Sequence, residues 1–261
     1  MHAAVILMYH RLGSGQLAER EPGEHLYTVA PEDFEAQLET LKSGACSPCD
    51  VSAIRHSGSG SRNPVAITFD DGNASDHSVA LPALARRGLP AAFFVTPAWV
   101  GSPGFMDWPA IRELADAGMT IGAHGLEHVP LSSLSEDELR RQLAEARRAI
   151  EARIARPVEW LALPGGFGGS REVVAAREVG FRNVLGSVPR LARSGASDEP
   201  IPRFSVRQGQ SLASFRALVE QRRATRLRYW LRHVVIGQMR ALLGSRGHAR
   251  LREAWLKLTP P

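Results

Sequence analysis

Lysine is nearly absent from this 261-residue sequence. Lys42 and Lys257 are the only two, so the net charge of +5 comes almost entirely from arginine. Arginines that bind nucleic acid are expected to gather into basic patches. Outside the C-terminal region the arginines are spread along the chain, and we therefore expect no nucleic-acid partner.

Cysteines and long apolar runs are also scarce. Cys46 and Cys49 form one Cys-x-x-Cys pair, but a zinc or redox role would need a second ligand pair or a thioredoxin-like context nearby. We interpret both as ordinary loop residues. No run reaches the roughly 18 apolar residues of a membrane span, and the N-terminus lacks the basic region and cleavage site of a secretory signal. The sequence predicts a cytoplasmic protein.

What the sequence does contain is a regular alternation of apolar runs and helical patterns. With 44% hydrophobic residues, the chain can build one large core. Predicted strands cover 3–9, 65–69, 91–96, 119–123, 159–163, 181–185 and 201–206, and predicted helices cover 31–41, 76–87, 108–117, 135–154 and 171–179. Strict alternation implies a parallel sheet with right-handed crossovers, and this many strands suit a closed or nearly closed α/β barrel. Its chemistry should lie at the C-terminal ends of the strands.

Polar side chains follow three of these runs directly. Asp70 and Asp71 end one, His124 and His128 follow another, and His10 ends the first. One carboxylate and two histidines suit zinc or another divalent ion with open positions, and the i, i+4 spacing of the histidines predicts one face of a helical turn. Two alternatives remain open, since Asp-Asp-Gly is ordinary composition for a strand-end turn and His10 could simply bond a loop carbonyl.

Together these motifs resemble a known family. Thr68-Phe69-Asp70-Asp71-Gly72, His124-x-x-x-His128 and Leu163-Pro164-Gly165-Gly166 are similar to the motifs of polysaccharide deacetylases, the NodB homology domain of carbohydrate esterase family 4. Met8-Tyr9-His10-Arg11 resembles the start of exopolysaccharide deacetylases. The resemblance implies a distorted (β/α)7 barrel, which we place at residues 1–210, followed by a basic helical extension at 211–261.

The resemblance also implies roles for the site residues. Asp71, His124 and His128 would hold one divalent ion, expected to be zinc, and Asp70 would be the general base. We expect a metal-dependent deacetylase of an N-acetylated sugar, polysaccharide or exopolysaccharide precursor. The metal would activate water and stabilise the oxyanion. The alternatives are a catalytically reduced carbohydrate-binding barrel and a same-fold hydrolase of a non-sugar amide.

The turn after the strand at 159–163 is a further part of the expected site. Pro164, Gly165 and Gly166 would lie at the substrate, where the Gly165 N–H could donate to the oxyanion.

Three departures from the family pattern qualify these roles. Ala162 stands where an arginine normally orients the base, so either another group such as Arg203 does this or Asp70 is less tightly tuned. Gly165 stands where the pattern has an aromatic residue, so an aromatic groove wall is missing. No Leu-x-His is identified in the region after residue 186, where the family's catalytic acid would sit. His10 is then the positional candidate for the acid, with the metal alone as the alternative.

The C-terminal extension lies outside the resemblance. Leu227 and Leu231 belong to one apolar helical face within an arginine-rich segment. We expect this helix to pack on the barrel, with Trp230 and Trp255 as core anchors. The alternatives are docking of a partner and peripheral contact with an anionic membrane, which would place the protein at the inner membrane face. The sequence does not set the oligomeric state.

Overall fold

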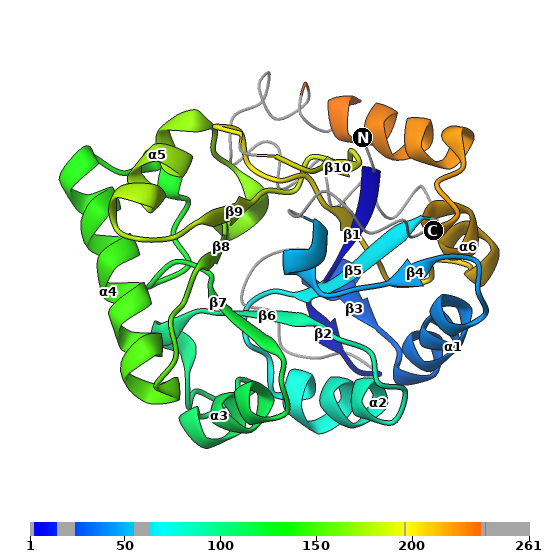
Figure 1. Cartoon of the computed structure of the whole chain (residues 1–261), viewed down its shortest axis with the longest axis horizontal. Helices are drawn as coiled ribbons and strands as arrows, with labels where there is room; N and C mark the ends of the chain where they lie inside the picture. Colours follow the sequence, from blue (N-terminus) through cyan, green and yellow to red (C-terminus); the bar gives the residue numbers. More distant parts are fainter. Residues whose placement is uncertain (1–2, 15–23, 55–62, 196, 236–237, 239–261) are drawn as a thin grey trace.

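The core of the protein is a curled sheet of mostly parallel strands (Figure 1). The computed structural model describes residues 3–14, 24–54, 63–195, 197–235 and 238. The strand order is β10-β1-β5-β6-β7-β8-β9. These strands are β1 (Ala3–Tyr9), β5 (Pro64–Phe69), β6 (Ala92–Val95), β7 (Thr120–Ala123), β8 (Trp160–Ala162), β9 (Asn183–Leu185) and β10 (Ala192–Arg193).

The segment from residue 201 to residue 205 nearly closes the sheet into a barrel. Ile201 forms a parallel bridge with Leu185 at the end of β9, and β11 (Phe204–Ser205) pairs parallel with β1. This segment therefore lies between the last and the first strands. The predicted distorted (β/α)7 barrel is confirmed, with β4 (Ser47–Pro48) added beside β5 and a separate pair formed by β2 (Arg11–Leu12) and β3 (Thr28–Val29).

Helices surround the sheet as the alternating pattern predicts (Figure 1). They are α1 (Pro31–Lys42), the π-helical η3 (Asp76–Ala80) that continues into α2 (Leu81–Ala85), α3 (Trp108–Asp116), α4 (Glu136–Ile154), α5 (Ser170–Glu178) and α6 (Leu212–Val219). Residues 223–235 are also helical. Short 3-10 turns are η1 (Glu24–Tyr27), η2 (Val51–Ile54), η4 (Pro97–Trp99), η5 (Leu131–Ser133) and η6 (Pro164–Gly166).

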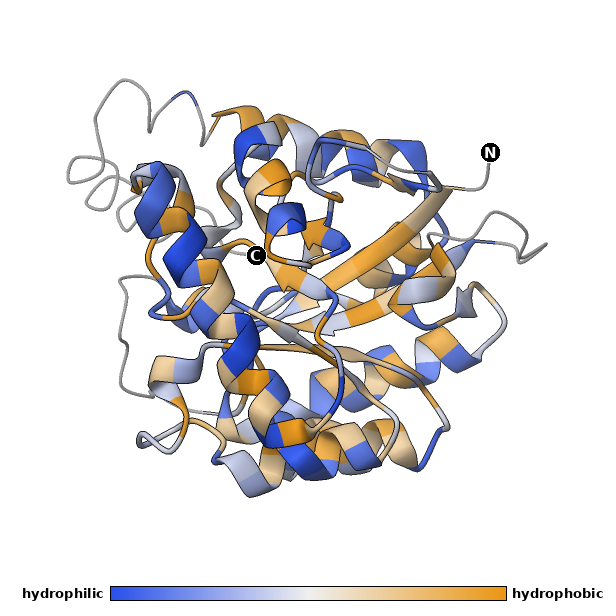
Figure 2. Ribbon diagram, turned by 60° about the vertical axis from the view of Figure 1, so that its left-hand side comes forward, coloured by the Kyte–Doolittle hydropathy of each residue, from blue (hydrophilic) through white to orange (hydrophobic). Residues whose placement is uncertain are grey.

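Alternation along the strands divides the buried residues into two clusters. Side chains on one face, such as Val5 and Ile67, pack under the surrounding helices, and those on the other, such as Ile6 and Ala66, fill the inside of the barrel. Figure 2 shows the strands in hydrophobic colours and hydrophilic residues on the helices. Asp70 is four positions after Ala66. Because side chains alternate along a strand, residues an even number of positions apart share a face, so the side chain of Asp70 also points into the barrel.

The helix at 223–235 differs from its expected packing. Trp230 is 37% exposed and Leu227 is 54% exposed, so the prediction that Trp230 anchors this helix in the core is wrong. Tyr229 makes the contact instead, with its ring edge-on to Phe204 at 5.5 Å between centroids. Trp255 lies outside the described residues. None of the described helices is long and apolar enough to cross a bilayer.

Candidate active site

Two adjacent carboxylates turn toward the same side at the end of β5. Asp70 continues the inward face of the strand, and Asp71 would point the other way if the strand went on. Asp71 instead takes a left-handed φ of +79° and Gly72 one of +80°. The sequence predicts the turn at Gly72, but Asp71 itself adopts the unfavourable conformation. Such strain at a non-glycine residue is typical of functional sites.

Asp71 lies between two imidazoles. Its Oδ1 atom is 3.3 Å from Nε2 of His124 and 3.4 Å from Nε2 of His128. One ligand atom from each of the three residues lies within 4.8 Å of the others. Burial by itself would raise the pKa of Asp71, but the two imidazoles hold the pKa of this carboxyl well below its usual range. The group is therefore an anion facing two nitrogen donors.

A backbone hydrogen bond orients His124. Its Nδ1 lies 2.9 Å from the carbonyl oxygen of Ala162 at the end of β8. A carbonyl can only accept, so Nδ1 carries a hydrogen, and Nε2, which faces Asp71, is the ring nitrogen left to bind a metal ion when it carries none. This arrangement is the usual one for a metal-binding histidine. The three residues thus fit a divalent ion in both spacing and donor type.

His128 reaches this cluster from an irregular loop. The predicted helical turn between His124 and His128 is wrong, because Gly125 has a φ of +70° and His128 one of +60°, and the residues between them are not helical. The His128 ring packs against Trp99 in η4, with 4.5 Å between centroids. Ring packing therefore holds the imidazole that helical spacing was expected to place.

Arg203 makes the contact that Ala162 cannot. Its Nη1 and Nη2 atoms each lie 2.7 Å from one oxygen of Asp70, and Nη1 lies 3.2 Å from Oγ1 of Thr68. Arg203 is fully buried and also donates through Nε to the carbonyl of Gly186. Burial opposes ionisation of Asp70, but the guanidinium keeps the pKa of this carboxyl below its usual value. Of the two alternatives left by the sequence, the structure shows the first.

An aromatic ring supports this arginine from inside the barrel. The guanidinium carbon of Arg203 lies 5.7 Å from the centre of the Phe94 ring. Phe94 has room only because residue 122 is glycine, since a Cβ atom there would be 2.5 Å from the ring and 2.9 Å from the carbonyl oxygen of Trp160. Gly122 therefore contributes to the site through packing alone.

His10 lies at the same mouth but has a different environment. Its ring packs on Tyr27 of η1 at 4.9 Å, and its buried Nδ1 has no hydrogen-bond partner among the described residues. Burial lowers the pKa of His10, although the charges of Asp71 and Asp70 partly oppose this. This direction of the pKa favours the neutral ring, which argues against a proton stored on His10.

The turn after β8 brings an aromatic side chain near the position where the pattern lacks one. Pro164 is buried, and the Gly166 N–H donates to the carbonyl of Leu163 at 2.7 Å. Gly165 has a φ of +64°, and a Cβ atom on it would lie 3.0 Å from the ring of Phe167. Phe167 is 42% exposed. The family pattern does not predict this residue, because the aromatic side chain lies two positions after its usual place at residue 165.

The expectation that no Leu-x-His follows residue 186 is wrong, because the sequence contains Leu231-Arg232-His233 in the helix at 223–235. Burial and the charge of Arg190 lower the pKa of His233. The described interactions of His233 include neither Asp70 nor Asp71, so this histidine is not placed as a catalytic acid.

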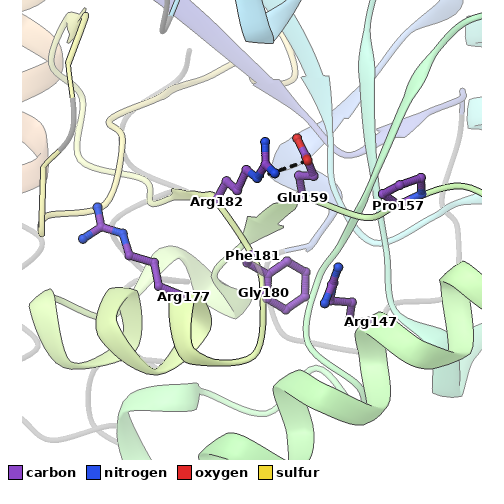
Figure 3. Close-up of a pocket in the computed structure, with 7 residues that line it drawn as sticks. All are labelled: Arg147, Pro157, Glu159, Arg177, Gly180, Phe181 and Arg182. Atoms are coloured by element: carbon purple, nitrogen blue, oxygen red, sulfur yellow. Dashed lines mark ion pairs between the residues drawn. The ribbon is translucent and has the colours of Figure 1, made fainter.

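A hollow of about 650 Å³ lies at the opposite, N-terminal ends of β8 and β9 (Figure 3). Its arginines are already engaged. Arg182 pairs with Glu159 at 3.2 Å, Arg177 pairs with Asp198, and Arg147 donates to two backbone carbonyls. We therefore place the active site at the other end of the strands.

A nearly closed α/β barrel with this arrangement of carboxylates and histidines at its mouth has the architecture of the polysaccharide deacetylases. The family model for polysaccharide deacetylases matches residues 57–184, and this part of the chain belongs to that family.

Several known proteins are similar to this chain in sequence, and solved structures are similar to it in fold. YxkH of Bacillus subtilis (strain 168), provisionally named a polysaccharide deacetylase, is 24% identical over 219 residues, which cover 82% of this chain and 75% of the relative. A peptidoglycan-N-acetylglucosamine deacetylase of Bacillus cereus is 25% identical over 179 residues, covering 67% of this chain and 64% of that protein. The structure of the Streptococcus pyogenes deacetylase PplD in complex with acetate matches in fold, with a TM-score of 0.72 and 19% identity over 80% of this chain and 95% of that one.

One buried acid, Asp76, lies near the site. Asp76, in η3, is fully buried, and neither of its carboxylate oxygens has a hydrogen-bond partner among the described residues. Burial, reinforced by the charges of Asp71 and Asp70, raises the pKa of Asp76 well above its ordinary value. A raised pKa means that folding favours the protonated form.

The Asp76→Asn variant should therefore gain stability as the pH rises. The stability that wild-type Asp76 contributes is complete below the unfolded-chain pKa of about 4 and is lost as the pH rises through the folded pKa. Without metal, the variant should unfold near the wild-type temperature at low pH and at a higher temperature near neutrality. Near neutrality its free energy of unfolding should exceed that of wild type by about 1–3 kcal/mol. Thermal unfolding in chelator across pH measures this. The exposed Asp116→Asn is the control, and a pH-independent gap would contradict the assignment.

Proposed function

We propose that this protein is a metal-dependent deacetylase that removes acetyl groups from an N-acetylated sugar or polysaccharide. The observation that carries the proposal is the pairing of two units at one barrel mouth. Asp71, His124 and His128 form a cluster fit for a divalent ion, and the arginine-held Asp70 has an oxygen 4.0 Å from Nε2 of His124. The Bacillus cereus relative is named for the same chemistry on peptidoglycan N-acetylglucosamine.

The three-residue cluster is proposed to hold the metal, with zinc as the expected ion because the donors are two imidazoles and one carboxylate. Bound there, such an ion would supply Lewis-acid activation of water and of the acetyl carbonyl. Asp71 contributes the negative charge of the set. His124 is oriented in advance by its bond to the Ala162 carbonyl, so little reorganisation is needed on binding.

Asp70 is proposed to take the proton of the attacking water. The Arg203 guanidinium keeps this carboxylate ionised and fixed in direction, so it is available as an acceptor at neutral pH. The backbone N–H of Gly165 is proposed as a donor to the oxyanion, and the exposed ring of Phe167 beside it as a wall for the sugar. Arg203 also removes one of the two reasons for the alternative of a catalytically reduced binding barrel.

The particular substrate and the location of the protein are proposed from the sequence. An exopolysaccharide precursor as substrate is proposed from the Met8–Arg11 opening of the sequence, and a cytoplasmic location remains a prediction from the sequence. A non-sugar amide substrate would leave the same site residues in place, so substrate profiling distinguishes this alternative.

Removal of either histidine of the cluster should abolish both metal binding and activity. The His124→Ala and His128→Ala variants are expected to lose the one divalent ion bound per chain, and chelator should have the same effect on wild type. Elemental analysis and acetate release from acetylated chitooligosaccharides measure this. His77→Ala is the matched control, because His77 is partly exposed and its ion-pair partner among the described residues is Glu113, outside the cluster. Unchanged metal content in both cluster variants would refute the metal site.

Replacement of Asp70 by asparagine should separate metal binding from turnover. Asp70→Asn keeps the shape of the side chain but not the proton acceptor, so kcat is expected to fall by roughly 10²–10⁴ while metal content is retained. Asp116→Asn, on the surface, should leave kcat unchanged. A variant that loses the metal together with activity would show that Asp70 is a ligand or a structural residue instead.

His10 is predicted from its position to be the catalytic acid, and the direction of its pKa favours the rival role of holding a substrate hydroxyl. His10→Ala should then raise KM with a nearly normal kcat and an unchanged alkaline limb of the rate profile. Measurement of kcat and KM across pH, with His77→Ala as control, decides between the roles. A flattened alkaline limb would restore His10 as the acid.

A further inference from the structure

Charge is divided unevenly along this chain. Residues 221–261 contain ten basic residues and one acidic residue, a net charge of +9, whereas residues 1–220 contain 22 basic and 26 acidic residues, a net charge of −4. The overall excess of positive charge thus belongs entirely to the C-terminal segment. A sign asymmetry of this kind indicates an anionic partner for that segment.

The helix at 223–235 presents an apolar surface outward. Four apolar side chains at positions i, i+3, i+4 and i+8 are exposed, and we refer to them as the outer face: Leu227 (54%), Trp230 (37%), Leu231 (50%) and Val235 (44%). This spacing places them on one side of the helix. An apolar face on a helix is normally buried against a core, and here it is turned away from one.

Arginines border the outer face. Arg226 and Arg228 lie one position on each side of Leu227, and Arg223 precedes it by one helical turn. Arg223 and Arg228 are exposed. Residues 221–235 contain five arginines and no acidic residue. An exposed apolar strip between cationic side chains is the pattern of a helix that lies in the headgroup region of an anionic bilayer.

The opposite side of the helix fastens it beside the barrel mouth. Tyr229 packs on Phe204, and burial together with the charge of Arg207 lowers the pKa of Arg232 to about 10. Arg207 lies over the ring of Tyr27, which in turn packs on His10. The helix is shown in orange in Figure 1, across the molecule from α4 and α5.

We propose that the outer face of the helix at 223–235 binds the surface of an anionic lipid membrane and holds the barrel mouth close to that surface. Leucine, tryptophan and valine bury favourably in the interfacial layer, while the bordering arginines contact lipid phosphates. Nucleic acid matches the charge but offers nothing to the aliphatic side chains. The proposal is independent of the deacetylase chemistry, because none of these residues belongs to the site.

Vesicle co-sedimentation of the full-length chain tests the proposal. Binding is expected to vesicles of phosphatidylcholine with phosphatidylglycerol, to be weak on phosphatidylcholine alone, and to fall steeply as salt rises from about 0.1 M to about 1 M, where the screening length shrinks from about 10 Å to about 3 Å. Leu231→Glu should weaken binding about tenfold or more, because it removes apolar contact and adds repulsion. Arg223→Gln/Arg228→Gln should weaken it and flatten the salt dependence.

Val174→Glu is the matched control, because Val174 is 46% exposed and belongs to α5, a helix that lies across the molecule from the helix at 223–235 (Figure 1). It should bind vesicles as wild type does, and Leu231→Glu should keep wild-type acetate release from a soluble substrate. No binding at low salt, or equal loss in both glutamate variants, would overturn the proposal. It would also be overturned if wild type were a dimer that Leu231→Glu made monomeric without vesicle binding, since the outer face would then be a contact between copies of the chain.

Discussion

The buried pair of Arg203 and Asp70 is the interaction on which the rest of the site depends. It joins β5 to the segment that closes the barrel, and both charged groups are removed from water. Removal of one partner from such a pair typically costs about 3–5 kcal/mol, because the other charge is left buried and uncompensated. The pair therefore links barrel closure to the state of the proposed base. A chain that fails to place residues 201–205 also fails to hold Asp70 ionised.

Strand alternation explains why the polar residues can gather without disturbing the core. One face of each strand packs against helices, and the other supplies alanines, larger aliphatic residues and aromatic rings to the barrel interior. Thr68, Asp70 and His124 extend this inner face toward the mouth. Packing inside the barrel also depends on Gly122. Because this residue has no side chain, the ring of Phe94 has room to lie beneath Arg203.

Local patterns predicted most of the fold and only part of the site. Apolar runs predicted the strands, and the positions directly after those runs predicted Asp70, Asp71, His124 and His128 as candidate site residues. The partner of Asp70 lies 133 residues away along the chain, so local spacing named Arg203 only as an alternative. The conformation of His128 depends on packing against Trp99, and the exposure of Trp230 depends on which side of its helix meets the barrel. Both are tertiary effects that helical spacing cannot reveal.

The acceptor that orients His124 belongs to the main chain. Any amino acid at position 162 would supply the same carbonyl oxygen, so the contact persists whatever side chain stands there. Position 162 can thus exchange an arginine for alanine without loss of the imidazole's orientation, provided that a guanidinium reaches Asp70 from elsewhere. The contact that orients His124 and the contact that holds Asp70 come from separate parts of the chain. Each contact can therefore change during divergence without loss of the other.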